Sequence, residues 1–209
     1  NRRLFAGVLL QRRHEKQWTW TAGYNLEFNR PEEINISDPY EFDRISTGKN
    51  YFISSLEMGV IRNTSDSELN PTRGSVTGFS FEIAPEILGS EVRFIKPSLD
   101  LRKYHTLPKG MVLAGRIRLR TIQKIEGTEG IPIFKRLFVG GSNSVRGYGY
   151  QELGNSDPNG NPVGGLSSFE ANLEVRFPVY GKLSGVVFLD MGLLDEHSFA
   201  YDMGDIRYT

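Results

Sequence analysis

The sequence predicts an all-β protein built from an antiparallel sheet of the barrel type, and three observations predict it. Apolar and polar residues alternate with a period of two over most of the chain, as they do in strands with two different faces. Clusters of Gly, Pro, Asn, Asp and Ser separate the alternating segments, as turns do. Many of the segments are also longer than the five or six residues of an ordinary strand.

Eight strands are predicted in order along the chain. The segment "WTWTAGYNLEF" alternates without interruption from Trp18 to Phe28. "LAGRIRLRT" sets an apolar row that begins at Leu113 against a row of arginines, and "FEANLEVRF" repeats the pattern from Phe169. The predicted strands span residues 3–13, 17–28, 50–62, 75–84, 92–104, 111–122, 166–178 and 184–192.

The links between these strands alternate between short and long. "HTLPKG" and "VYGK" are short, whereas residues 29–50 and 123–165 form long polar or Gly-rich segments. This alternation predicts an antiparallel meander with tight turns at one end and large loops at the other. No segment shows the periodicity of a helix.

Composition excludes several classes of protein. Lys+Arg and Asp+Glu both number 25, so the chain lacks the basic excess of a general nucleic-acid binder. The absence of cysteine excludes disulfide frameworks and thiolate metal sites. No apolar run approaches the roughly 20 residues of a membrane-spanning helix, and we recognise no signal peptide at the start of the sequence.

Alternation alone leaves open which face of the sheet is in contact with water. A soluble barrel buries its apolar face, whereas an outer-membrane barrel turns that face to lipid and keeps a polar lumen. Strands of this length suit an oblique crossing of the bilayer. The polar faces carry long charged side chains of both signs, as a hydrated lumen does. The residues favour the membrane barrel, and a soluble ligand-binding barrel stays open as an alternative.

The Gly-rich segment "LFVGGSNSVRGYGYQELG", residues 137–154, does not match a known catalytic or nucleotide-binding motif. It contains neither G-x-x-x-x-G-K-[ST] nor a G-x-G-x-x-G that opens a helix, and it lacks the G-x-S-x-G of a hydrolase. The segment from Asp157 begins like a calcium loop, but Pro162 and Ser168 stand where that loop needs Gly and Glu. The sequence therefore predicts no catalytic residue, no metal site and no cofactor.

Four segments, taken in order, resemble one family of outer-membrane proteins. "LNPTRGS" at 69–75 resembles its Pro-Thr-x-Gly turn, and "FKRLFVGGSNSVRGY" resembles the entry to its sixth extracellular loop. "PVGGLSSFEANLEVRFPV" resembles the return strand, and "VVFLDMG" a following strand that carries an aspartate. The combination, from about residue 50 to 192, resembles the outer-membrane insertase and translocon superfamily of the BamA and TamA type, also called the bacterial surface antigen family.

The resemblance implies a fold and a domain organisation. It implies an antiparallel transmembrane β-barrel of the outer-membrane type with about sixteen strands. Residues 1–209 would be the central part of one barrel domain, an incomplete portion of about eight strands. Residues 123–165 would form a long loop folded into the lumen.

The resemblance also implies a site on this loop. Arg146 would pair with Glu174 on the return strand and with Asp190 on the next strand. Arginine suits this role because its planar fork binds carboxylates bidentately and stays charged. On the residues alone, an Arg146 in a solvated loop stays open. The remaining motif residues are Val145, Gly147 and Tyr148, with Gly140, Gly141 and Gly149 as glycines that let the backbone turn sharply near the wall.

Three further expectations concern the two faces of the sheet. Tyr148 and Tyr150 are expected to pack along the lumen with their hydroxyls hydrogen-bonded. The row of arginines from Arg116 to Arg120 is expected to line the lumen and to offset the acidic row of the strand near residue 170. Trp18, Trp20 and Tyr24 are expected to contribute to an aromatic girdle at the membrane interface.

The function implied by the resemblance is not covalent catalysis. It is assistance in the insertion, assembly or translocation of other proteins, by a barrel in the bacterial outer membrane. The implied partners are membrane lipid, unfolded outer-membrane protein clients, and accessory periplasmic or lipoprotein subunits, with no nucleic acid. A passive channel and a dedicated exporter of the two-partner secretion type are the alternatives from a related class.

Overall fold

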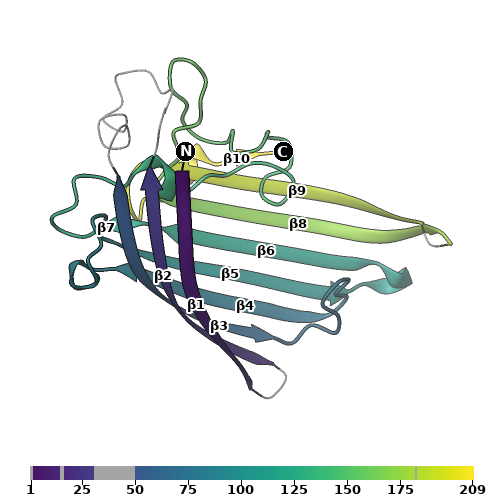
Figure 1. Ribbon diagram of the computed structural model, residues 1–209. Coiled ribbons are helices and arrows are strands. Elements are labelled where there is room, and N and C mark those ends of the chain that lie inside the picture. Colours follow the sequence, from purple (N-terminus) through teal and green to yellow (C-terminus); the bar gives the residue numbers. More distant parts are fainter. Residues whose placement is uncertain (1, 15–16, 31–49, 182) are drawn as a thin grey trace.

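The chain forms one antiparallel sheet that curls into part of a barrel (Figure 1). The structure, a computed structural model, describes residues 2–14, 17–30, 50–181 and 183–209. The strands follow one another in the sheet in the order β1-β2-β3-β4-β5-β6-β8-β9-β10, and β7 pairs with β5 away from this path. Most of the polar link predicted between the second and third strands lies outside the described residues.

All eight predicted strands are present in the predicted order. Five of them are longer than predicted, because pairing with neighbours extends them beyond their alternating segments, whereas β6 is two residues shorter. Their bounds are β1 Arg2–His14, β2 Trp18–Arg30, β3 Tyr51–Asn63, β4 Gly74–Ala84, β5 Phe94–Thr106, β6 Val112–Thr121, β8 Ser167–Tyr180 and β9 Leu183–Asp195. Two strands of two residues each, β7 (Gln123–Lys124) and β10 (Arg207–Tyr208), were not predicted.

Helical structure in the described residues is limited to single 3-10 turns in the links. These turns are η1 Glu86–Leu88, η2 Pro108–Gly110, η3 Ile133–Lys135 and η4 Met203–Asp205. None of the described helices has the length and hydropathy that would take it across a membrane.

The apolar face of the sheet is exposed. In-register pairing aligns the apolar rows of neighbouring strands, so that Met58 lies beside Phe81 and Leu173 beside Leu189. Met58 is 55% exposed and Val187 is 65% exposed. A soluble barrel would bury this stripe, so the exposure contradicts the soluble ligand-binding alternative. It is the arrangement of a barrel whose outer surface faces lipid.

The hydrophobic core lies on the opposite, polar face, near the long loops. Ile53, Phe94 and Ile122 point to this face from β3, β5 and the end of β6, and each is fully buried. Residues of the loops, including Ile131 and Leu137, cover them. The long loop after β7 therefore packs on the polar face of the sheet.

The sheet is not closed within the described part of the chain, because its order begins at β1 and ends at β10. The strands β1 to β3 rise across the direction of β4 to β9 in Figure 1, which shows the curvature of the sheet. The expectation of an incomplete antiparallel barrel is confirmed.

Candidate functional site

The Gly-rich loop folds back on itself before it reaches the wall of the sheet. Isolated bridges join Leu137 to Gly165 and Val139 to Leu153, which draws the two ends of the segment together. Gly140 and Gly141 have φ values of 111° and 100°. Residues with a side chain rarely adopt these angles, so glycine is required at this turn.

Arg146 lies between Glu174 of β8 and Asp190 of β9, the two carboxylates that the family resemblance assigns to it. Its Nε and Nη2 donate to the two oxygens of Asp190, each over 2.7 Å. Its Nη1 donates to Glu174 Oε1 over 2.7 Å, and its backbone N–H donates to Asp190 Oδ2 over 2.9 Å. The guanidinium thus binds one carboxylate bidentately and a second one through its remaining nitrogen.

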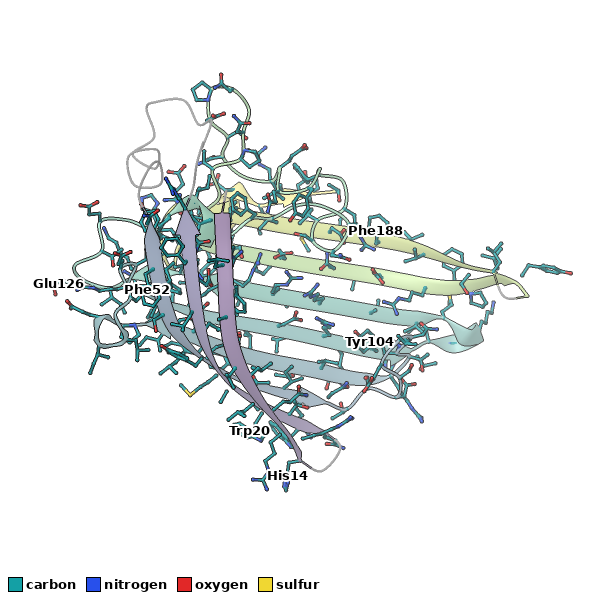
Figure 2. All side chains as sticks on the ribbon, in the orientation of Figure 1. His14, Trp20, Phe52, Tyr104, Glu126 and Phe188 are labelled. Atoms are coloured by element: carbon teal, nitrogen blue, oxygen red, sulfur yellow. The ribbon has the colours of Figure 1, made fainter. Side chains whose placement is uncertain are left out.

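The side chain of Arg146 also stacks on an aromatic ring. Its guanidinium carbon lies 3.7 Å from the centroid of Phe188, which precedes Asp190 by two residues and points to the same face of β9. Figure 2 shows Phe188 on β9, the strand beside the loop. A guanidinium over a ring at this distance gains a cation–π attraction, and the ring shields the ion pairs from water.

The charges at this site are balanced. Glu174 also accepts from Arg176 over 2.9 Å, so two carboxylates meet two guanidiniums. Asp190 is fully buried, and Asn172 donates to it over 2.9 Å. The hydrogen bonds that Arg146 donates to Asp190 and, to a smaller extent, to Glu174 hold the pKa of Arg146 above its already high ordinary value, although burial opposes this shift. Arg146 is therefore charged at every relevant pH.

A second group of contacts, around Glu170, fixes the loop immediately before the motif. Ser144 donates to Glu170 Oε2 over 2.6 Å, and Asn172 donates to the Ser144 carbonyl over 2.8 Å. Glu170 is 1% exposed and forms ion pairs with Arg118 and Arg120 at 3.4 and 2.8 Å. β6 pairs with β8 so that Arg118 lies opposite Glu170, which confirms the expected charge pairing for Arg118 and Arg120. Arg116 instead pairs with Asp100 of β5.

An apolar contact completes the docking of the motif. Val145 is fully buried in a cluster with Val139 and Leu153. A Cβ on Gly192 of β9 would lie 2.6 Å from Val145 Cγ2, so the missing side chain makes room for the loop. Sequence reasoning did not select Gly192; the signal available was a glycine inside an apolar strand, next to the aspartate of "DMG".

The other motif residues lie around this contact. A Cβ on Gly147 would lie 2.4 Å from the side chain of Thr209, whose backbone pairs with Asp190. A Cβ on Gly149 would meet the carboxylate of Glu152. Tyr148 packs against the Val145 cluster.

The expectation for Tyr150 is wrong. This residue is 80% exposed instead of packed along the wall. Gly140 packs against the backbone of Gly149 and Glu152, and Tyr150, between these two residues, lies beside Gly141.

The loop has a second anchor, at Lys135 in η3, which sequence reasoning missed. Lys135 Nζ donates to Glu27 Oε1 of β2 over 2.5 Å and lies 3.8 Å from Glu82 Oε1 of β4. Lys135 is 9% exposed, and Arg3 and Asn29 also donate to Glu27. No motif marks a single lysine, so the sequence offered no signal for it.

Two further kinds of site were considered from the sequence, a metal site and a calcium loop. The described residues contain no group of three or more His, Asp or Glu side chains that could hold a metal ion. The carboxylate of Asp157 accepts from the backbone N–H of Asn159 and of Asn161 over 2.9 and 2.7 Å. It closes a polar turn. The arrangement of charged residues around Arg146 and Lys135 is suited to hold a loop on a wall.

Comparisons with known proteins agree with this architecture. The sequence profile of the Omp85 superfamily domain matches residues 1–204. The chain is 32% identical over 191 residues to the outer membrane protein assembly factor BamA of Nitratidesulfovibrio vulgaris, which covers 88% of this chain and 24% of that protein. It is 32% identical over 124 residues to BamA of Neisseria meningitidis serogroup B, covering 57% of this chain and 15% of that protein.

A solved structure has the same fold. The crystal structure of BamA from Haemophilus ducreyi lacking POTRA domains 1-3 superimposes with a TM-score of 0.76 and 18% sequence identity, covering 92% of this chain and 41% of that one. The chain spans about a quarter or less of the length of the two BamA sequences that it matches. It belongs to the Omp85 superfamily and is part of a β-barrel of the bacterial outer membrane.

Proposed function

We propose that the barrel containing this chain assists the insertion and assembly of other outer-membrane proteins. Its relatives are named as outer membrane protein assembly factors. The observation that carries the proposal from the structure is the loop of residues 123–165, which is held on the polar face by Arg146 at one point and by Lys135 at another. In this proposal the polar face is the lumen of the complete barrel, and residues 1–209 are the central part of that barrel.

The proposed mechanism is not enzymatic. An unfolded client strand in or near the bilayer has backbone N–H and C=O groups that must be paired, because lipid offers them no partner. A barrel with an exposed strand edge satisfies them by pairing, as in other cases of strand addition. The anchored loop would brace the wall from inside, so that the edge opens without collapse of the rest of the barrel.

The experiment that tests this role is client assembly by the full-length protein in lipid vesicles. We expect Arg146→Ala to slow the appearance of folded, protease-resistant client severalfold. Arg73→Ala is the matched control, because Arg73 lies in an exposed turn with its side chain 80% exposed. If Arg146→Ala destabilises the barrel and clients still assemble at the unchanged rate, the bracing role is wrong.

The same loop distinguishes an assembly factor from a passive channel or a dedicated exporter. Its packing on the polar face supports a plugged lumen over an open pore. We expect the full-length barrel in a planar bilayer to show small, flickering currents. A large steady conductance that does not change in Arg146→Ala would favour the channel instead.

A further inference from the structure

One groove on the outer face carries charges that neither the fold nor the proposed assembly role explains. It is an apolar hollow of about 690 Å³ across β1 to β4, lined by Leu10, Trp20, Ala22, Met58, Val60, Phe79 and Phe81, with Gln11 and Arg12 among its lining residues. Ala22 has the small side chain among these large ones, which leaves the hollow on a face that is otherwise filled.

Two arginines, Arg12 and Arg62, lie beside the groove at the end of the sheet where β1 meets β2. The register places Arg12 opposite Trp20 and places Arg62 opposite Trp18, so both arginines belong to the apolar face of the sheet. Arg62 lies 5.6 Å from the centroid of Trp18, and the rings of Trp18 and Trp20 stack at 6.3 Å. Among the described residues, neither arginine forms an ion pair with a carboxylate. Two guanidiniums without a carboxylate partner among the described residues, on a face that is otherwise apolar, would attract an anionic group.

The position of this group in the membrane follows from the loop lengths. β1 and β2 are joined at residues 15–17, at the end of the sheet that carries the short turns. In barrels of this type the short turns are periplasmic and the long loops extracellular. Figure 2 shows Trp20 and His14 at the end of the sheet opposite Glu126, which lies in the long loop. Tryptophans at such an end lie at the level of the lipid headgroups.

We propose that the outer face of β1 to β4 is a binding site for an anionic phospholipid of the periplasmic leaflet. One acyl chain lies in the groove over Ala22, and the headgroup phosphate lies between Arg12 and Arg62. Arg12 lies on β1 and Arg62 lies on β3, two strands away and two residues further along the strand. At the usual spacing of strands and residues, their Cα atoms are about 12 Å apart. Two extended arginine side chains can converge on a phosphate across that distance, and the planar guanidinium binds phosphate oxygens bidentately.

The chain carries its own reporter for this site, because its two tryptophans, Trp18 and Trp20, both lie there. The full-length protein is placed in phosphatidylcholine vesicles that contain a rising fraction of brominated phosphatidylglycerol or brominated phosphatidylcholine, whose bromines quench nearby tryptophan. The signal of a Trp18→Phe/Trp20→Phe variant is subtracted to isolate the two residues. We expect half-maximal quenching at a lower fraction of phosphatidylglycerol than of phosphatidylcholine, by up to about 25-fold if each of the two guanidiniums contributes about five-fold.

Two variants separate this site from a general attraction of charge. Arg12→Gln/Arg62→Gln should bring the two quenching curves together. Arg13→Gln is the matched control, because Arg13 follows Arg12 in β1 but lies on the opposite face, where it pairs with Glu68 at 3.9 Å. It should keep the preference. Equal quenching by both lipids in the unmodified protein would overturn the proposal, and so would an equal loss of preference in Arg13→Gln and in Arg12→Gln.

Ala22→Leu tests the groove itself, since the larger side chain fills it. It should weaken quenching by both lipids and leave the phosphatidylglycerol preference in place. Unchanged quenching in this variant would show that no acyl chain occupies the hollow. The gel mobility shift between the folded and the heat-denatured barrel checks that each variant is folded.

Discussion

The two anchors of the long loop use different physics. Arg146 forms four hydrogen bonds to carboxylates on two adjacent strands and keeps a quarter of its side chain exposed. Lys135 donates to one carboxylate, Glu27, which lies 108 residues away in the chain, and only 9% of its side chain is exposed. The arginine anchor depends on geometry that only a planar fork supplies, whereas the lysine anchor depends on burial of a point charge.

The partners of the two anchors differ in what remains when the cation is removed. Asp190 is fully buried and would keep Asn172 as a neutral donor. Glu27 would keep both Arg3 and Asn29. Loss of Arg146 therefore leaves the more isolated buried charge, and we expect the two anchors to differ in energy for this reason.

The largest effect is expected from Arg146→Ala. Removal of one partner of a buried ion pair costs about 3–5 kcal/mol, and this estimate applies here because Asp190 forms no ion pair with another cation within the described part of the chain. The urea midpoint of the barrel in vesicles measures it. Arg146→Lys should recover only part of the loss, since an ammonium does not bind Asp190 and Glu174 as a fork does. If Arg146→Lys recovered the full stability, the planar guanidinium would not be needed, and the proposed difference between the arginine and lysine anchors would be wrong.

Lys135→Ala should cost less, about 1.5–3 kcal/mol, as expected for one hydrogen bond to a charged group. The double variant Lys135→Ala/Glu27→Gln tests whether the two side chains act together. We expect the second change to cost little once the first is made, with a coupling energy of about 0.5–3 kcal/mol in a double-mutant cycle of urea midpoints. Strictly additive effects would contradict a direct ion pair.

Gly192→Ala tests the apolar contact beside the arginine anchor. The new Cβ would lie 2.6 Å from Val145, so we expect a loss of about 1–2 kcal/mol through overpacking. Gly78→Ala in β4 is the matched control, because its Cβ would have no heavy atom nearer than 3.7 Å. Adding Val145→Ala should relieve the clash in the Gly192 variant. If Gly78→Ala lowered the stability as much as Gly192→Ala, the effect would come from the conformation of glycine in a strand and not from the docking of the loop.

The smallest effect is expected at Asp66, a charged residue of an exposed turn, with which the larger effects of the two buried anchors can be compared. Hydrogen bonds from the Thr72 hydroxyl and backbone lower the pKa of Asp66 to about 2. A carboxyl with a lowered pKa stabilises the folded state above its unfolded pKa and loses this contribution as pH falls through the folded value. The difference in urea midpoint between the unmodified protein and Asp66→Asn should therefore be small and constant above pH 5. It should shrink between pH 4 and pH 2; a difference that grows on acidification would show the opposite sign.

The strands could be predicted from sequence because alternation is a local property. Trp18 to Phe28 and Leu113 to Thr121 alternate cleanly, and both lie in strands of the structure. β7 and β10 could not be predicted, because two residues are too few to show a period. Ile53 is an exception to the alternation of apolar and polar residues, because it is an apolar residue on the polar face. It is buried there because the long loop covers that end of the sheet.

The sequence by itself determined the alternation, the turns and the motif around Arg146, since each of these is written in neighbouring residues. Only the tertiary structure decided that Lys135 reaches Glu27, that Gly192 leaves room for Val145, and that Tyr150 is exposed. These facts depend on which distant strands the loop meets. Contacts between residues far apart in the chain leave no local pattern, because they are selected by packing and charge only after the sheet has curved around the loop.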